Sequence, residues 1–389
     1  MIKCRPILAE RSGLSGRFAL VWLRQLPRSL DNLKEEPAVL KGLRRAILAS
    51  LLSILLAAPA QVLAWGNTGH EAVAWLAWHQ MNPATKTRVL ALLALVPTLH
   101  SPTTGKPIAG YAEWKKQIPS GLTADDQNCY LFMLAATWAD SIKHQGFQDS
   151  DKPPVGVTKD VNTGFIDKVT HGYWHFVDAG FSSDGGSSPT TPIPNAATEI
   201  PALRLAISST EDDVLKSYDM IWLEHLVGDI HQPLHGTVRY FQNKGDVGAN
   251  LVEIELTPDM QKLFICPPSK YTPTELHAFW DDLPGSCAPA PALTPAVTFA
   301  SKLPLLAPDP LKPASGLVAD TNASDWATES LALAKSDSYK TPIGPGLAQS
   351  NGSAYQITPD YYNSALQDAK DRISLAGARL ARLLDDNLK

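Results

Sequence analysis

A short run of His and Asp residues constrains this chain more than any other feature. Residues 225–235 read His-Leu-Val-Gly-Asp-Ile-His-Gln-Pro-Leu-His. The apolar side chains before it recur every three or four residues, which predicts a helix over 211–231. The predicted buried face of this helix carries Leu215, Tyr218, Trp222, His225 and Asp229. A His and a carboxylate four residues apart on one face can bind the same metal ion.

Other His and Asp residues extend this candidate metal site. Pro233 ends the predicted helix, so His235 can turn towards a different ion. His277 and Asp281 repeat the four-residue spacing. The pool of nitrogen and oxygen ligands is completed by Asp140 and His175. A single His is typical of an ordinary buried or surface residue, but two such pairs in one chain indicate metal binding.

Residues 43–64 have the pattern of a secretory signal. Arg44 and Arg45 precede an apolar run that ends in Val62-Leu63-Ala64, a signal-peptidase pattern. The run is too short for a membrane span, and no other segment has about 18 uninterrupted apolar residues. We therefore expect a secreted or periplasmic protein without stable membrane association. The 42 residues before Leu43 exceed a normal signal n-region, which indicates either a start codon assigned too far upstream or an added leader.

Cleavage after Ala64 would create a further candidate ligand. Trp65 would then carry a free α-amino group, whose pKa is near 8 and which binds metal once deprotonated. His70 follows five residues later, at the start of a predicted helix. Taken by itself, Trp65 is typical of a core residue.

The charge balance argues against tight binding of duplex nucleic acid. The chain has 34 Lys and Arg and 39 Asp and Glu, a net charge of −5. Residues 1–64 hold 10 of the basic and 4 of the acidic residues, so 24 and 35 remain from residue 65 onward, a net charge of −11. Such a chain lacks a basic footprint, so metal ions would supply the positive charge at a phosphate site.

The remaining sequence predicts an all-α protein with one folded domain over residues 65–389. Hydrophobic content of 44% supports a sizeable core. Besides 211–231, the expected helices are 68–80, 84–96, 125–143, 274–282, a piece at 325–335, and 358–387. The first begins with a capping-box spacing of Thr68 and Glu71. Residues 251–256 could form a small strand of one hairpin, and residues 179–200 and 283–357 are typical of long surface loops.

Three cysteines follow the predicted cleavage site. An exported protein permits disulfides, and Cys266 and Cys287 would close a short loop. Cys129 lies in an apolar run and is typical of a buried thiol. Three cysteines are too few for both a disulfide and a Cys-based zinc site, so His and Asp would hold any metal.

Several motifs together resemble the S1/P1 nucleases, a family of secreted zinc-dependent nucleases. They occur in the family's order over residues 65–387, and Ala376–Ala381 resembles the family's closing helix. The matching strings are Trp65-Gly-x-x-Gly-His70, Trp138-Ala-Asp140, Trp174-His175-Phe176-x-Asp178, His225-x-x-Gly-Asp229-x-x-Gln-Pro-Leu-His235 and Leu276-His277-x-x-Trp280-Asp281.

The resemblance implies three zinc ions in a mostly helical, monomeric enzyme. The first ion would be held by Asp140, His175, His225 and Asp229, and the second by His235, His277 and Asp281. The third would be held by the amino and carbonyl groups of Trp65 with His70 and a shared Asp229. The implied substrate is single-stranded DNA or RNA, cut to products with 5′ phosphates, and the same site can remove 3′ phosphates from mononucleotides.

The resemblance also implies roles for residues around the ions. Asp140 would orient the attacking water, and Lys143 and Asn250 would contact the phosphate. Phe176 would stack on a base, and Asp178 would accept hydrogen bonds from its edge. Bases must leave a stack to enter such a pocket, which favours single strands.

This chain departs from the family pattern in two respects. Ala249 stands where the family has the second glycine before its asparagine, which affects the expected loop geometry. The gap between His235 and His277 is long, and residues 179–200 and 283–357 look like insertions. Insertions there would change the rim of the cleft, and with it substrate choice, but not the metal chemistry.

The remaining His residues are expected to play lesser parts. His231 points away from the face that carries His225, so it is not expected to be a ligand. His171 could hydrogen-bond to a metal ligand without binding the metal itself. Surface or structural positions are expected for His79, His100 and His144.

Two other functions fit part of the pattern. Zinc phospholipase C enzymes resemble this family, but their last ligand is usually Glu, whereas this chain has Asp281. A zinc-holding protein without turnover is the other, although no expected ligand is missing. Activity on a choline phospholipid, set against activity on single-stranded DNA, would separate these interpretations.

Overall fold

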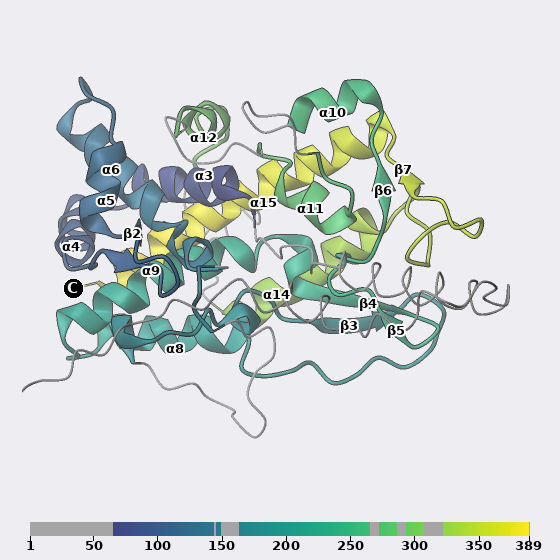
Figure 1. The fold of residues 1–389 in the computed structure, drawn as a ribbon, viewed down its shortest axis with the longest axis horizontal. Coiled ribbons are helices and arrows are strands. Elements are labelled where there is room, and N and C mark those ends of the chain that lie inside the picture. Colours follow the sequence, from purple (N-terminus) through teal and green to yellow (C-terminus); the bar gives the residue numbers. More distant parts are fainter. Residues whose placement is uncertain are drawn as a thin grey trace, which may run out of the picture. The chain divides into compact units, whose positions relative to one another are not determined.

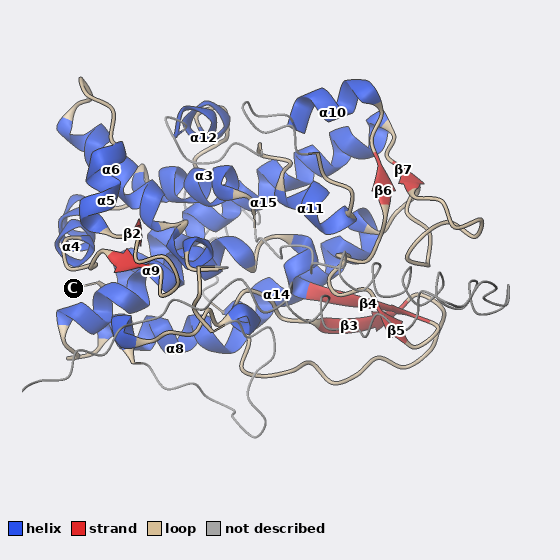
Figure 2. Cartoon of the chain, in the orientation of Figure 1, coloured by secondary structure: helices blue, strands red, loops and turns tan. Residues whose placement is uncertain are grey.

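Three helices form the centre of the protein, and they carry or cover the candidate ligands. The computed structural model describes residues 65–143, 145–148, 163–264, 272–285, 293–306 and 322–388. Helix α3 (Asn67–Trp78) packs against α15 (Pro359–Asn387) and against α9 (Asp213–Asp229). Figure 1 shows α15 as the long yellow helix behind α3, and Figure 2 shows how far helices dominate.

Local sequence signals explain where these helices begin. The Thr358 side chain accepts a hydrogen bond from the backbone N–H of Tyr361, and Pro359 occupies the first turn of α15. Asp212 caps α9 in the same way by accepting from Val214 N–H. Both helices are therefore started by their own sequence, while packing stabilises them along their length.

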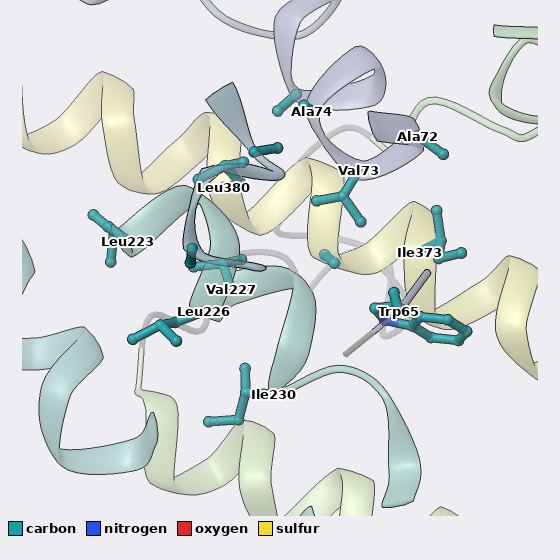
Figure 3. Packing of buried hydrophobic residues seen from close by; sticks show 14 of the residues in the cluster. Trp65, Ala72, Val73, Ala74, Leu223, Leu226, Val227, Ile230, Ile373 and Leu380 are labelled. Atoms are coloured by element: carbon teal, nitrogen blue, oxygen red, sulfur yellow. The ribbon is translucent and has the colours of Figure 1, made fainter. Parts of the chain in front are cut away.

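Apolar side chains from the three helices meet in one core (Figure 3). Val73 from α3, Leu226 and Val227 from α9, and Ile373 and Leu380 from α15 are almost completely buried. Burying such side chains is the main favourable contribution to folding. The same packing fixes the relative positions of the helices, and thereby of the polar residues at their ends.

Shorter helices surround this centre. Helix α8 packs on α9, while α6 and α12 pack on α3. The surrounding helices are α4 (Pro83–Leu93), α5 (Tyr111–Gln117), α6 (Ala124–Ala135), α7 (Trp138–Ser141), α8 (Ala196–Ser208), α10 (Pro258–Phe264), α11 (Leu276–Asp281), α12 (Leu293–Ala300) and α14 (Ala323–Leu333). Short 3-10 turns lie at Gly164–Ile166, Gly172–Trp174 and Pro233–Gly236, and a π-helical turn lies at Ala334–Ser338.

Within the described residues, the strands are short and form three small sheets. Strand β3 (Ala179–Ser182) pairs in parallel with β4 (Thr237–Phe241), which forms a hairpin with β5 (Lys244–Gly245). Strand β6 (Ile254–Glu255) pairs in parallel with β7 (Tyr355–Gln356), and β1 (Leu99–His100) pairs with β2 (Pro107–Ala109) in antiparallel orientation. The β3–β4–β5 sheet is the one that borders the candidate site.

The prediction of an all-α class is confirmed, and most expected helices are present. The expected 125–143 helix is two helices, because the chain turns between Ala135 and Trp138, where Thr137 Oγ1 donates to Leu134 O. Of the expected 251–256 strand, residues 254–255 pair in parallel with β7, and Glu253 forms an isolated antiparallel bridge with Glu275, so no hairpin is formed. Helices α5, α8, α10 and α12 were not expected from the sequence.

The predicted capping box is wrong. Gly66 is the N-cap of α3, no side chain caps the helix, and Thr68 and Glu71 are buried inside it. The N–H groups of Gly69 and His70 donate to Gly66 O, so the first turn is closed by backbone alone. The spacing misled because the helix begins at Asn67, which places Thr68 inside the first turn rather than at the N-cap.

Some predictions concern residues that the structure does not describe, and others concern Cys129 and membrane helices. Residues 1–64, His144, and the pair Cys266 and Cys287 lie outside the described residues. Cys129 is buried with a free thiol, as predicted. Within the described residues, no helix combines the length and the apolar character that crossing a membrane would require.

Candidate metal centre and adjoining cavity

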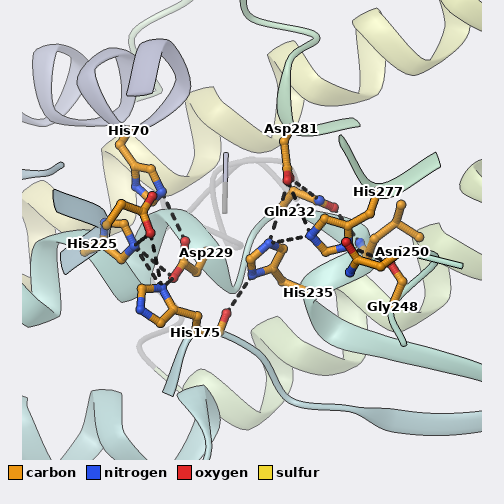
Figure 4. Close-up of polar contacts among 12 residues, drawn as sticks. His70, His175, His225, Asp229, Gln232, His235, Gly248, Asn250, His277 and Asp281 are labelled. Atoms are coloured by element: carbon orange, nitrogen blue, oxygen red, sulfur yellow. Dashed lines mark hydrogen bonds and ion pairs between the residues drawn. The ribbon is translucent and has the colours of Figure 1, made fainter. Parts of the chain in front are cut away.

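The first group of candidate ligands gathers around Asp229 at the end of α9. We call it the Asp229 group; its members are His70, Asp140, His175, His225 and Asp229. They come from α3, α7, the segment after the turn Gly172–Trp174, and α9. Figure 4 shows His70, His175 and His225 directed at Asp229. Helix packing thus brings together residues that lie up to 159 positions apart in the sequence.

Both carboxylate oxygens of Asp229 face histidine nitrogens. Its Oδ1 lies 3.1 Å from His70 Nε2, and its Oδ2 lies 2.8 Å from His175 Nδ1 and 3.3 Å from His225 Nε2. The Asp140 Oδ1 atom lies 3.6 Å from His225 Nε2. Each Asp229 oxygen thus faces a different set of histidines, an arrangement that would allow two ions to share this carboxylate.

Close packing at Gly228 allows α3 and α9 to approach at this point. A Cβ atom at Gly228 would lie 2.7 Å from His70 Nδ1, closer than real Cβ contacts allow. Any other residue there would push the His70 ring away from Asp229. The glycine in the sequence His-x-x-Gly-Asp is therefore explained by the space that the neighbouring ligand occupies.

The second group, which we call the Asp281 group, consists of His235, His277 and Asp281. His235 Nδ1 donates to His175 O at 2.7 Å, and His277 Nδ1 donates to Gly248 O at 2.5 Å. The two Nε2 atoms then face one another at 3.1 Å. In these neutral tautomers both Nε2 atoms present lone pairs, which repel unless a cation lies between them.

The surroundings of three of these histidines favour the neutral form that binds metal. Burial, followed by the charge of Lys143, lowers the pKa of His175 to about 3, and burial lowers the pKa of His70 and of His235. Neutral imidazole is the metal-binding form. Burial also raises the pKa of Asp281 well above its usual range, a cost that a bound cation would remove. The donor set therefore fits divalent metal ions.

Trp65 lies beside the helix that carries Asp281. Its side chain is fully buried, and the N–H of the next residue, Gly66, donates to Asp281 O at 2.9 Å. The peptide that follows Trp65 is thus anchored to the helix that carries Asp281. This anchoring is compatible with the N-terminal ligand expected from the sequence.

The predicted phosphate-contacting lysine lies against the Asp229 group. Lys143 Nζ is 2.7 Å from Asp140 Oδ1, and both side chains are nearly buried. Burial by itself raises the pKa of Asp140, but the charges of Lys143, His225 and His175 hold it below its usual range. Asp140 is therefore ionised, as both a ligand and a proton acceptor require.

A cavity of about 570 Å³ adjoins the Asp281 group, and His277 forms part of its lining. Half-buried Phe176 and Asp178 line it, together with Asn250, whose Nδ2 donates to Val247 O at 2.8 Å. Burial, and then the charge of Asp246, raises the pKa of Asp178 to about 6. The structure thus brings together the predicted base-contacting residues and one predicted ligand.

The loop before Asn250 closes despite the alanine in place of a glycine. Ala249 adopts φ 68° and is fully buried, and the Asn250 N–H donates to Val247 O. A left-handed backbone costs alanine about 1 kcal/mol, which the surrounding packing absorbs. The departure seen in the sequence therefore leaves the loop closed.

Comparison with known proteins agrees with this geometry. The profile of the S1/P1 nuclease family matches residues 65–389. The chain belongs to the S1/P1 nuclease family. Nuclease S1 of Aspergillus oryzae is 23% identical over 338 residues, which cover 82% of this chain and 91% of that protein. Family membership makes the chain a nuclease, a hydrolase acting on nucleic acids, and does not favour the interpretation as a phospholipase.

The other histidines that the structure describes in this S1/P1 nuclease are held by other partners or lie at the surface. His231 Nδ1 donates to Val227 O, and its Nε2 accepts from Arg379 at 2.9 Å. His171 bonds Asp167 and stacks on Trp174, one layer of side chains away from the ligands. His79 and His100 are exposed.

Sequence reasoning missed Gln232, which touches a candidate ligand directly. Its Nε2 donates to Asp281 Oδ1 at 2.7 Å, and its Oε1 accepts from Leu234 N–H. Gln232 thereby fixes both the carboxylate and the turn that leads to His235. Its place inside the string Asp-x-x-Gln-Pro-Leu-His was a usable signal, since a fully buried amide beside ligands needs partners.

Sequence reasoning also missed a set of hydrogen bonds that connects α15 to the turn after α9. Arg379 donates to both oxygens of Glu329, at 2.8 and 2.7 Å, and to His231. Arg372 donates to Glu329 and to His231 O. No periodicity in the sequence could have paired these residues, because α14 and α15 meet only in the folded protein.

Proposed function

We propose that this protein is an exported, monomeric, three-zinc phosphodiesterase that cuts single-stranded DNA or RNA to products with 5′ phosphates. The same site would remove 3′ phosphates from mononucleotides. The observation that carries the proposal is the pair of facing Nε2 atoms of His235 and His277, 3.1 Å apart beside a buried Asp281. A cation between these atoms would relieve the repulsion of their lone pairs.

Three ligand sets follow from the proposal. The first zinc would be held by Asp140, His175, His225 and Asp229, and the second by His235, His277 and Asp281. The third would be held by His70, the shared Asp229, and the amino and carbonyl groups of Trp65. Support comes from the separate histidine neighbours of the two Asp229 oxygens and from the buried position of Trp65.

Residues of the chain would carry out the rest of the reaction. Bound zinc supplies Lewis acidity and lowers the pKa of bound water towards neutrality. The ionised Asp140 would orient the attacking water and accept its proton. Lys143, held against Asp140 at 2.7 Å, and Asn250 would bind the phosphate oxygens and fix phosphorus for in-line attack.

The cavity beside His277 would supply the preference for single strands. Phe176 would stack on a base, and Asp178 would accept hydrogen bonds from its edge. A base inside a duplex cannot enter a cavity of this kind without leaving its stack. The enzyme would therefore act fastest where bases are already unstacked.

Metal content and activity should be measured together on protein that begins at Trp65. We expect about three zinc ions per chain and cleavage of single-stranded DNA to 5′-phosphorylated products, abolished by EDTA and restored by zinc. Cleavage that persists in EDTA would contradict the proposal. Three zinc ions without cleavage would keep the ligand sets and overturn the substrate.

An N-terminally extended protein tests the N-terminal ligand and the domain boundaries. We propose that residues 1–64 are a leader with its signal at 43–64, and that 65–389 is the nuclease domain, with insertions near 179–200 and 283–357. Protein with extra residues before Trp65 should then bind fewer zinc ions while folding normally. Three zinc ions in the extended protein would show that the N-terminus is not a ligand.

The role of Asp140 is tested by Asp140→Asn. This variant should lose most turnover while keeping its fold and circular dichroism spectrum. The matched control is Glu211→Gln, which changes an exposed carboxylate and should leave turnover unchanged. Near-normal turnover of Asp140→Asn would exclude the assigned role.

A further inference from the structure

The small β3–β4–β5 sheet places an aromatic ring in the cavity that the proposed mechanism does not use. Tyr240, on β4, is half-buried and lines the cavity together with Phe176 and Asp178. Pro192 and Pro194 line it as well. These prolines and Tyr240 come from two of the regions in which the chain is longer than expected for its family.

The two ligand-bearing segments lead directly to this ring. His235 Nδ1 donates to His175 O, and Val177 N–H donates to His235 O, so the chains run side by side from the start. They continue as β3 and β4, paired in parallel from Ala179 and Thr237 onward. Tyr240 is therefore fixed relative to the metal centre through a hydrogen-bonded ladder that starts at two proposed ligands.

Glycines on both neighbouring strands hold the Tyr240 ring in position. A Cβ atom at Gly245 on β5 would lie 3.1 Å from Tyr240 Cε1, and one at Gly180 on β3 would lie 3.3 Å from Cε2. The two ring edges thus rest against backbone on either side. A ring seated in this way presents a fixed surface to the cavity and loses little conformational freedom when a ligand binds.

Tyr240 also lies close to the predicted base-contacting carboxylate. Burial raises the pKa of Tyr240, and the charges of Asp178 and Asp246 raise it further. A flat ring beside a carboxylate matches a nucleobase, because the ring stacks on a π-face and the carboxylate accepts from N–H groups at the edge. The remaining lining is mostly apolar, which suits a base rather than a phosphate.

We propose that Tyr240 is a substrate-contacting residue that forms a second aromatic wall of the cavity, in addition to Phe176, and that it stacks on a nucleobase. This inference rests on the proposed nuclease function and adds a determinant of affinity that comes from the β3–β4–β5 sheet. Tyr240 takes no part in holding metal or in the attack on phosphorus.

Binding and kinetics of Tyr240→Ala, Tyr240→Phe and Phe241→Ala test the proposal. Phe241 is the matched control, because the next residue on a strand points to the opposite face and its ring borders a different groove with Pro345 and Gly346. Each variant is first checked for zinc content and melting temperature. Calorimetry then measures binding of a nucleoside 5′-monophosphate and of ribose 5-phosphate, and a single-stranded dinucleotide serves as substrate.

We expect Tyr240→Ala to weaken nucleotide binding and raise KM for the dinucleotide about 10-fold, equivalent to about 1.4 kcal/mol, with kcat within about 2-fold. Ribose 5-phosphate, which lacks a base, should bind wild type and variant equally. Tyr240→Phe and Phe241→Ala should behave as wild type.

Equal loss of affinity for ribose 5-phosphate, or an unchanged nucleotide Kd, would overturn the proposal. The proposed function fails in a different way: wild-type protein would then not cleave the dinucleotide at all. The calorimetric comparison of nucleotide and ribose 5-phosphate still decides the role of Tyr240 in that case.

Discussion

The metal-ligand framework and the cavity wall are built in opposite ways. The Asp229 and Asp281 groups lie mainly on or next to helices α3, α7, α9 and α11, at spacings that are visible in the sequence. The cavity wall is made by strands of two to five residues and by loops from distant segments. The proposed metal chemistry, which tolerates little movement, is thus supported by buried helices. The proposed substrate contacts come from strands and loops, where sequence changes cost less stability.

The largest effect is expected from replacing Asp229, the residue that two of the proposed zinc ions would share. Asp229→Asn should lower cleavage on the order of 1,000-fold, because losing a bridging carboxylate removes several kcal/mol of metal-derived transition-state stabilisation. Zinc content, measured by mass spectrometry, should fall by at least one ion. His79→Ala, which alters an exposed histidine, is the control and should change neither quantity. Full zinc content in Asp229→Asn would contradict the bridging assignment.

The next largest effect concerns Arg379 on α15, which supports the turn that leads to the Asp281 group. Arg379→Met should lower the free energy of unfolding by about 3 kcal/mol, because it leaves buried His231 and half-buried Glu329 without the buried arginine that donates to both. Urea denaturation would measure this change. Arg382→Met removes a surface ion pair with Asp386 and should cost under about 0.5 kcal/mol. Equal destabilisation by both variants would show that α15 does not anchor the turn before His235.

A smaller effect is expected at Asp178 in the cavity wall, whose contribution to stability depends on pH. The folded-state pKa of Asp178 is raised to about 6, so the folded protein binds its proton more tightly than the unfolded chain. Stability is therefore lost as pH rises from about 4 to about 6. Asp178→Asn should recover about 1–2 kcal/mol at pH 8 and nothing at pH 4. Urea midpoints at both pH values test this, and Glu211→Gln should show no such difference.

The smallest effect is expected from replacing Ala249, in the cavity-wall loop that precedes Asn250. Ala249→Gly should change the free energy of unfolding by less than about 1 kcal/mol, because relief of the left-handed backbone is offset by greater freedom of the unfolded chain. KM should stay within about 2-fold of wild type, since the loop already closes with alanine. A several-fold fall in KM would show that alanine distorts the position of Asn250.

The sequence predicted which residues lie together where the signal is a local spacing. His225 and Asp229, or His277 and Asp281, share a face because four residues make about one helical turn. The pairing of Tyr240 with Gly245 or of β6 with β7 has no local signal, since each strand is too short to show alternation. The helix α8 was missed although Asn195 and Thr198 form a capping box, because the preceding Pro- and Ser-rich residues masked its start.

The sequence alone determined the helical class, the metal-binding residue types and the candidate ligands, because these depend on periodicity and on the chemistry of single side chains. Only the tertiary structure decided that both Asp229 oxygens face different histidines, that Gln232 holds Asp281, and that Tyr240 borders the cavity. These relations join residues from separate elements, and side-chain packing in three dimensions, rather than spacing along the chain, sets their distances.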